Sequence, residues 1–133
     1  MLNIPGYQVS EEIYRGPQTV AYRGLRKSDE MPVVIKTSQK RNPAIWTMSS
    51  FQNESQLTEH LDIDGVPAHL DFIRLENRPV IVMADDGAMS LREYMRHHEM
   101  DTPAFLTFAL RLARILQQVH ARNIIHKDIK PDN

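Results

Sequence analysis

The amino-acid sequence predicts an α+β fold, with five strands before the longest helix. Short segments rich in Val, Ile and Tyr fill the first third of the chain, and two more follow a helical segment. The last third changes to helical spacing of apolar residues. With 133 residues, 41% hydrophobic and 25% charged, the chain has the composition and length of one small globular domain.

The first three predicted strands form an antiparallel meander. Turn-forming residues separate them, at 15–17 and at 27–30. The strands themselves are expected at residues 6–13, 19–25 and 31–37.

A helix is expected next, followed by two more strands. Ser49 and Gln52 have the spacing of a capping box, with Ser49 as N-cap. Helical spacing then places four residues on one face: Phe51, Glu54, Leu57 and Leu61. The two strands are expected at residues 70–75 and 79–84.

Helices are expected after the polar segment 85–87. Ser90 can cap a short helix, and Thr102 can cap a longer one with Pro103 at its first position. Asn123 is a plausible left-handed residue after that helix. The predicted apolar stripe of the long helix comprises Phe105, Phe108, Ala109, Leu112, Leu116 and Val119.

Charge and cysteine content exclude several classes of function. Lys and Arg number 16 against 17 Asp and Glu, so no net field would attract nucleic acid or an anionic membrane. Cysteine is absent, which excludes disulfides and thiolate metal sites. No signal peptide or apolar run long enough to span a bilayer is visible, so a cytoplasmic protein is expected.

Two charged residues occur in apolar surroundings. Lys36 ends the apolar run 33–35, and Glu54 lies on the predicted apolar face of a helix. Taken singly, each is best explained as a solvent-exposed residue. A partly buried glutamate needs a cation, and a lysine on a neighbouring strand would supply one.

The last eight residues carry the most specific motif. His126, Asp128 and Asn133 have the spacing of the protein-kinase catalytic loop, histidine and aspartate two apart and asparagine five further on. With Lys36 and Glu54 upstream in the expected order, the chain resembles the first half of a eukaryotic-type Ser/Thr protein kinase domain. The resemblance implies a small lobe at 1–84, with a five-stranded antiparallel sheet and one helix. It also implies a hinge and the incomplete start of a large lobe at 85–133.

The resemblance also implies roles in phosphoryl transfer from ATP with Mg²⁺ to a protein substrate. Lys36 would hold the α- and β-phosphates, and Glu54 would hold Lys36. Asp128 would accept or orient the proton of the substrate hydroxyl, Lys130 would act on the γ-phosphate side, and Asn133 would bind Mg²⁺.

The glycine-rich phosphate loop departs from the family pattern. Of the three glycine positions only Gly16 is kept, Tyr14 and Thr19 occupy the others, and Pro17 removes one backbone amide. We therefore expect a weakened or altered nucleotide site. The resemblance places these residues against the nucleotide: Ile13, Gly16, Ala21, Val34, Lys36, Met83, Ala84 and Asp86.

Several alternatives remain open. A complete kinase needs a D-F-G segment and further large-lobe helices, which these 133 residues do not contain, so the fragment alone is expected to be inactive. Further domains of the same polypeptide are expected, since the start of the chain resembles the kinase modules of large bacterial signalling proteins. The altered loop favours a pseudokinase-like binding module, whereas the presence of Lys36, Glu54, Asp128 and Asn133 argues against one. An aminoglycoside-type kinase shares the catalytic-loop spacing, although Lys130-Pro131 favours a protein kinase. A gene remnant without activity is the last possibility.

Overall fold

The computed structural model describes residues 2–126 and 129–131, and these fold into two compact units. The first unit comprises Met1–Leu61 and Pro67–Asp86, and the second comprises Asp62–Val66 and Gly87–Asn133. The lobes predicted from the sequence divide at 84/85, whereas in the structure residues 85–86 belong to the first unit and residues 62–66 to the second.

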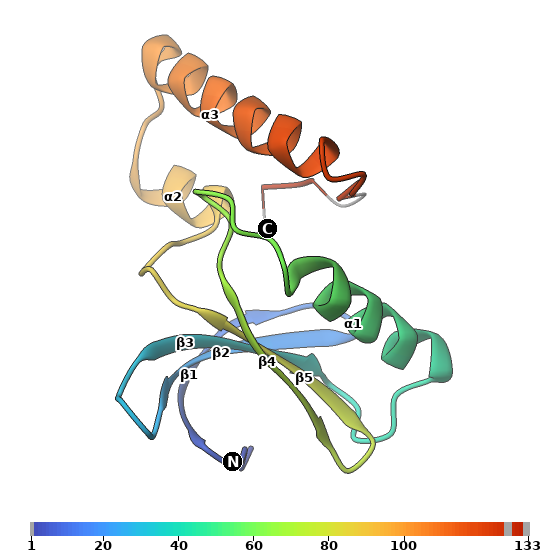
Figure 1. Ribbon diagram of the computed structural model, residues 1–133. Helices are drawn as coiled ribbons and strands as arrows, with labels where there is room; N and C mark the ends of the chain where they lie inside the picture. Colours follow the sequence, from blue (N-terminus) through green and yellow to red (C-terminus); the bar gives the residue numbers. More distant parts are fainter. Residues whose placement is uncertain (1, 127–128, 132–133) are drawn as a thin grey trace. The chain divides into compact units, whose positions relative to one another are not determined.

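An antiparallel sheet of five strands forms most of the first unit (Figure 1). Its order is β1-β2-β3-β5-β4, so the first three strands form a meander and the last two a hairpin that joins at β5. The hairpin turns through Glu76, whose φ of 57° is left-handed. The predicted α+β fold with five antiparallel strands is confirmed. The strands are β1 Tyr7–Arg15, β2 Thr19–Arg26, β3 Pro32–Ser38, β4 His69–Leu75 and β5 Arg78–Ala84.

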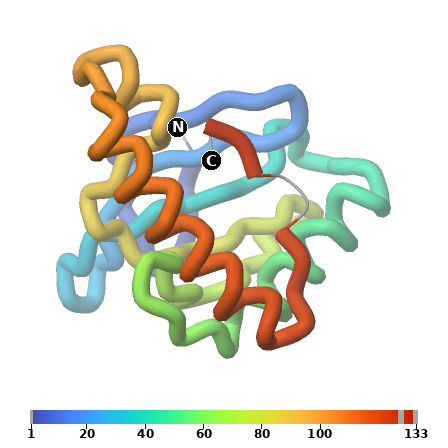
Figure 2. Tube along the Cα trace, turned by 90° about the horizontal axis from the view of Figure 1, so that it is seen from above, coloured from blue at the N-terminus to red at the C-terminus, as the bar shows by residue number. Residues whose placement is uncertain are grey.

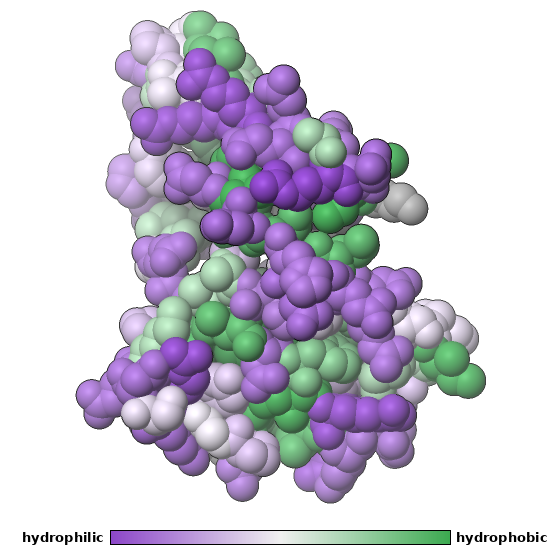
Figure 3. All heavy atoms as spheres, viewed as in Figure 1, coloured by the Kyte–Doolittle hydropathy of each residue, from purple (hydrophilic) through white to green (hydrophobic). Residues whose placement is uncertain are grey.

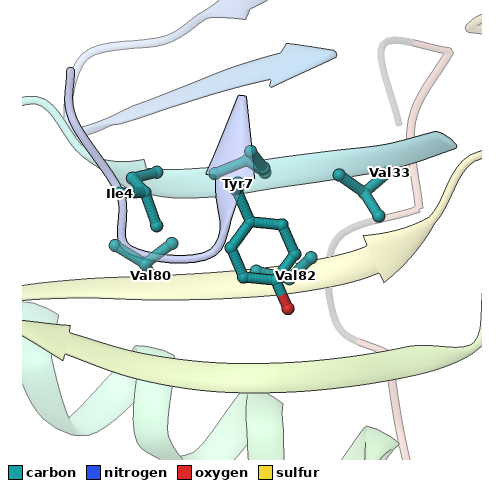
Figure 4. Packing of buried hydrophobic residues seen from close by; sticks show 6 residues of the cluster. Ile4, Tyr7, Val33, Val80 and Val82 are labelled. Atoms are coloured by element: carbon teal, nitrogen blue, oxygen red, sulfur yellow. The ribbon is translucent and has the colours of Figure 1, made fainter. Parts of the chain in front are cut away.

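One face of this sheet carries the main apolar core. Side chains of Ile4 and Tyr7 gather with Val33 over Val80 and Val82 of β5 (Figure 4). Ile35 completes the cluster. Burying each such aliphatic side chain contributes about 1.5–3 kcal/mol, so this face supplies much of the stability of the unit.

The helix α1, Ile45–Thr58, packs against the opposite face (Figure 1). Successive side chains of a strand point to opposite faces, so Lys36 points away from the core that holds Ile35. Lys36 meets Glu54 of α1, which places the helix on that side. The helix buries three side chains at four-residue intervals, namely Thr47, Phe51 and Ser55.

The predicted start and face of this helix are partly wrong. The N-cap is Ala44, and Ser49 lies inside the helix. Burial of Thr47, whose hydroxyl lies 3.4 Å from the side-chain oxygen of Gln18, extends the helix toward its N-terminus. Phe51 is buried as predicted, but Leu57 is 49% exposed and Leu61 lies beyond the end of the helix.

The second unit contains two helices, α2 Leu91–His97 and α3 Thr102–His120. In Figure 2, α3 is the long helix that runs from orange to red. Ser90 caps α2 as predicted, accepting a bond from the N–H of Glu93 at 3.2 Å. The N-cap of α3 is Asp101 and not Thr102, because the Asp101 carboxylate accepts a 2.8 Å bond from the N–H of Ala104. An ionised acceptor also suits the positive end of the helix dipole.

The apolar stripe of α3 is only partly covered. Val119 is buried, and Leu112 and Leu116 are half-buried, but Phe105 and Phe108 are exposed. Asn123 has the predicted left-handed conformation, with φ of 60°. Apolar side chains are visible among polar ones on the face drawn in Figure 3. No helix in the described part of the chain combines the length and hydrophobicity needed to cross a membrane.

Candidate active site

Lys36 and Glu54 form an ion pair between β3 and α1. The Nζ atom lies 2.6 Å from Oε1 and 2.7 Å from Oε2 of the carboxylate. The side chains are 29% and 37% exposed, so the pair lies at the edge of the unit's interior and is open to a ligand. The two residues singled out in the sequence are thus brought together across 18 positions of the chain.

The pair retains capacity to bind an anion. An ammonium group has three N–H donors, and the two carboxylate contacts use two of them. The centroid of the Phe51 ring lies 5.7 Å from Nζ, close enough for a cation–π contact that helps to orient the lysine side chain. The lysine can therefore donate to a phosphate oxygen while Glu54 holds it.

Several residues predicted to contact the nucleotide share the face of the sheet that carries Lys36. Ala21 pairs directly with Lys36, and Val34 pairs with Met83 two positions along β3. The face is therefore apolar beside a cation, as an adenine ring joined to phosphates requires. Ile13 is 42% exposed in β1, next to a register shift between Glu12 and Tyr14.

The end of β5 is tied into the first unit by its backbone. The N–H of Ala84 donates to the carbonyl of Ala68 at 2.9 Å, so this N–H is already engaged within the first unit. The N–H of Asp85 donates to Pro32 at 3.1 Å, and its carboxylate lies 2.9 Å from Nε of Arg23. Asp86 is exposed.

The loop between β1 and β2 offers few backbone amides. Gly16 donates its N–H to the carbonyl of Thr19 at 2.9 Å, and Pro17 has no N–H. The side-chain amide of Gln39 donates to the Gly16 carbonyl, and the Gln39 N–H donates to Gln18 at 2.9 Å. This loop therefore offers fewer backbone N–H donors to a phosphate than a three-glycine loop would offer.

The predicted catalytic loop is described only in part. Asp128 and Asn133 lie outside the described residues. His126 and Lys130 are exposed, and Pro131 accepts a 2.8 Å bond from the N–H of Arg92. The described residues contain no group of three or more His, Cys, Asp or Glu side chains able to hold a metal ion.

One contact near the ion pair has no signal in the sequence. Ser55, next to Glu54 on α1, lies 2.8 Å from Nε2 of His69 at the start of β4. Both residues line an open cavity of about 460 Å³ between α1 and β4. No spacing rule signals this contact, because it depends on how α1 is rotated on the sheet.

Comparison with known proteins assigns the family. The family model described as protein kinase domain matches residues 7–133, and the chain belongs to this family. Several of the relatives that it matches are described as serine/threonine-protein kinases.

Three relatives illustrate the extent of the similarity. The chain is 28% identical to human serine/threonine-protein kinase ULK1, over 91% of this chain and 12% of that protein. It is 29% identical to PknK of Mycobacterium tuberculosis (strain ATCC 25618 / H37Rv), over 96% of this chain and 12% of that protein. It is 24% identical to mouse Aurora kinase C, over 98% of this chain and 48% of that protein. The chain spans less than half the length of each of these relatives.

Proposed function

We propose that the chain is the N-terminal part of an ATP-dependent protein serine/threonine kinase domain. The observation that supports this most is the contact of 2.6 Å between Lys36 and Glu54, on the face of the sheet that Ala21, Val34 and Met83 share. Phosphoryl transfer requires a protein mainly to position the reacting groups and to neutralise the charge of the phosphates. The Lys36–Glu54 pair suits both tasks.

Each residue would contribute in its own way. Bound ATP with Mg²⁺ would supply the phosphoryl group. Lys36 would bind phosphate oxygens with its remaining donor, and Glu54 would hold it in place. In the catalytic loop, Asp128 would accept or orient the proton of a protein hydroxyl, Lys130 would lie on the γ-phosphate side, and Asn133 would be a Mg²⁺ ligand.

The adenine side of the proposed site is apolar. Ala21, Val34 and Met83 would pack on the ring, with Ile13 at its edge. Backbone groups of Ala84 and Asp86 would bond the ring, and the Gly16 loop would lie near the phosphates. ATP use also favours a cytoplasmic location for the proposed enzyme.

A pseudokinase-like regulatory module is the second candidate. The bond from the Gly16 N–H to Thr19 and the missing amide of Pro17 favour it, because they reduce the donors available to phosphates. In both cases, the partners would be a protein and further domains of the same polypeptide.

Phosphorylation by the parent protein tests the proposal. The parent protein, meaning the polypeptide with a complete kinase domain that would contain these 133 residues, is purified and incubated with labelled ATP, Mg²⁺ and a general protein substrate. Its Asp128→Ala variant is treated in the same way. We expect transfer that the variant loses. Equal turnover in both proteins would contradict an enzyme function. Absence of both transfer and ATP binding in the wild type would favour the pseudokinase-like module.

A further inference from the structure

We propose that Ser55 and His69 are positioning residues, which fix the rotation of α1 on the sheet and thereby bring Glu54 to Lys36. The Ser55 hydroxyl lies 2.8 Å from Nε2 of His69, and Ser55 is only 5% exposed. This hydrogen bond joins α1 to β4, whereas the ion pair of the neighbouring Glu54 joins α1 to β3.

Apolar packing alone leaves the rotation of α1 weakly determined. All of α1 lies within the described residues, and Phe51 is its one buried hydrophobic side chain. Ile45, Trp46 and Leu57 are 85%, 69% and 49% exposed. The hydrophobic effect is not directional, so a single buried ring can tolerate a change in the helix rotation.

The hydrogen bond between Ser55 and His69 is directional, so it can fix the rotation of α1. Adjacent residues of an α-helix are about 100° apart, so fixing Ser55 toward β4 also fixes where Glu54 points. A rotation of about 20° moves a group at the outer radius of a helix, about 5–6 Å from its axis, by about 2 Å. Such a shift would break a 2.6 Å contact between Glu54 and Lys36.

This inference depends on the proposed function only for its consequence in catalysis, because the ion pair can be observed directly. The probe is the NMR signal of the Lys36 side chain in the 133-residue chain, recorded as ¹⁵Nζ and ¹³Cε shifts. Glu54→Gln gives the reference spectrum for a lysine that has lost its partner.

Four variants distinguish an effect on the rotation of α1 from the effect of simply losing a side chain. Ser55→Ala and His69→Leu each remove the hydrogen bond. His69→Gln keeps a nitrogen that can replace Nε2. His60→Leu is the matched control, because it removes an exposed histidine just beyond α1.

In Ser55→Ala and His69→Leu we expect the Lys36 signals to move toward those of Glu54→Gln. His69→Gln and His60→Leu should keep the wild-type signals. Wild-type signals in a folded Ser55→Ala chain would overturn the inference, and this small substitution decides the question should His69→Leu unfold. Movement in His60→Leu to the same extent would also overturn it. If the Lys36 signals respond as expected while the parent transfers no phosphate, the proposed function fails and the positioning pair stands.

Discussion

At the scale of single residues, the burial of Phe51 decides how firmly α1 is attached. Its side chain is 4% exposed, whereas that of Leu57 on the same helix is 49% exposed. Truncating a buried phenylalanine removes its transfer free energy and leaves a cavity.

We therefore expect Phe51→Ala to lower the free energy of unfolding by about 3–5 kcal/mol. The matched change Leu57→Ala should alter it by only about 0.5 kcal/mol. Urea unfolding, followed by the fluorescence of the single tryptophan, Trp46 in α1, measures both. Equal effects of the two substitutions would show that Phe51 does not anchor the helix.

A second residue-scale prediction concerns the turn between β2 and β3. Arg26 meets Asp29 at 2.6 Å, and this hydrogen bond lowers the pKa of the Asp29 carboxyl to about 2 from its ordinary 3.8. Because the folded-state pKa is the lower one, the contribution to stability is present above the ordinary value. It is lost as the pH falls through about 2.

An NMR titration of the Asp29 carboxyl carbon should give a midpoint near 2. Arg26→Gln should raise that midpoint toward 3.8, the ordinary value of the group. A wild-type midpoint already near 3.8 would mean that the two side chains do not interact in solution.

At the scale of elements, the two long helices show why their starts are hard to predict. Local signals placed the start of α1 at Ser49, but the contact of Thr47 with Gln18 favours an earlier start. Ser50 instead donates to the carbonyl of Trp46 at 2.9 Å, a bond that serine commonly makes inside a helix.

The cap of α3 gives an element-scale prediction. Asp101→Ala should destabilise the helix by about 1 kcal/mol, because the N–H of Ala104 loses its acceptor. Thr102→Ala should have a much smaller effect, since Thr102 is already inside the helix. Thermal unfolding followed by circular dichroism compares them. A larger loss for Thr102→Ala would restore the cap predicted from the sequence.

Sequence patterns predicted the order of strands and helices and the residues of the ion pair. Lys36 and Glu54 are each charged in an apolar context, but singly each is best explained as solvent-exposed, and their pairing is implied only by the resemblance to protein kinases. Ser55 and His69 could not be found in the same way. Their contact depends on the true start of α1 and on its rotation, which tertiary packing determines.

At the scale of the whole molecule, the proposed phosphoryl transfer needs segments that these 133 residues do not include. The 133 residues lack the D-F-G segment and the remaining large-lobe helices that the family uses. We therefore expect no phosphate transfer from ATP with Mg²⁺ by the purified 133-residue chain in a radiolabel assay. Robust transfer that depends on Asp128 would contradict this.

The most direct test of the kinase account is phosphate transfer by the parent protein with Lys36 replaced. Lys36→Met removes the cation that the structure holds 2.6 Å from Glu54, whereas Lys27→Met removes an exposed lysine from the β2–β3 turn. Loss of a positioned donor to a charged group typically lowers the rate by about 100-fold or more. The account predicts a fall of that size in kcat/KM for Lys36→Met and none for Lys27→Met. Wild-type kcat/KM in the Lys36→Met parent would contradict it.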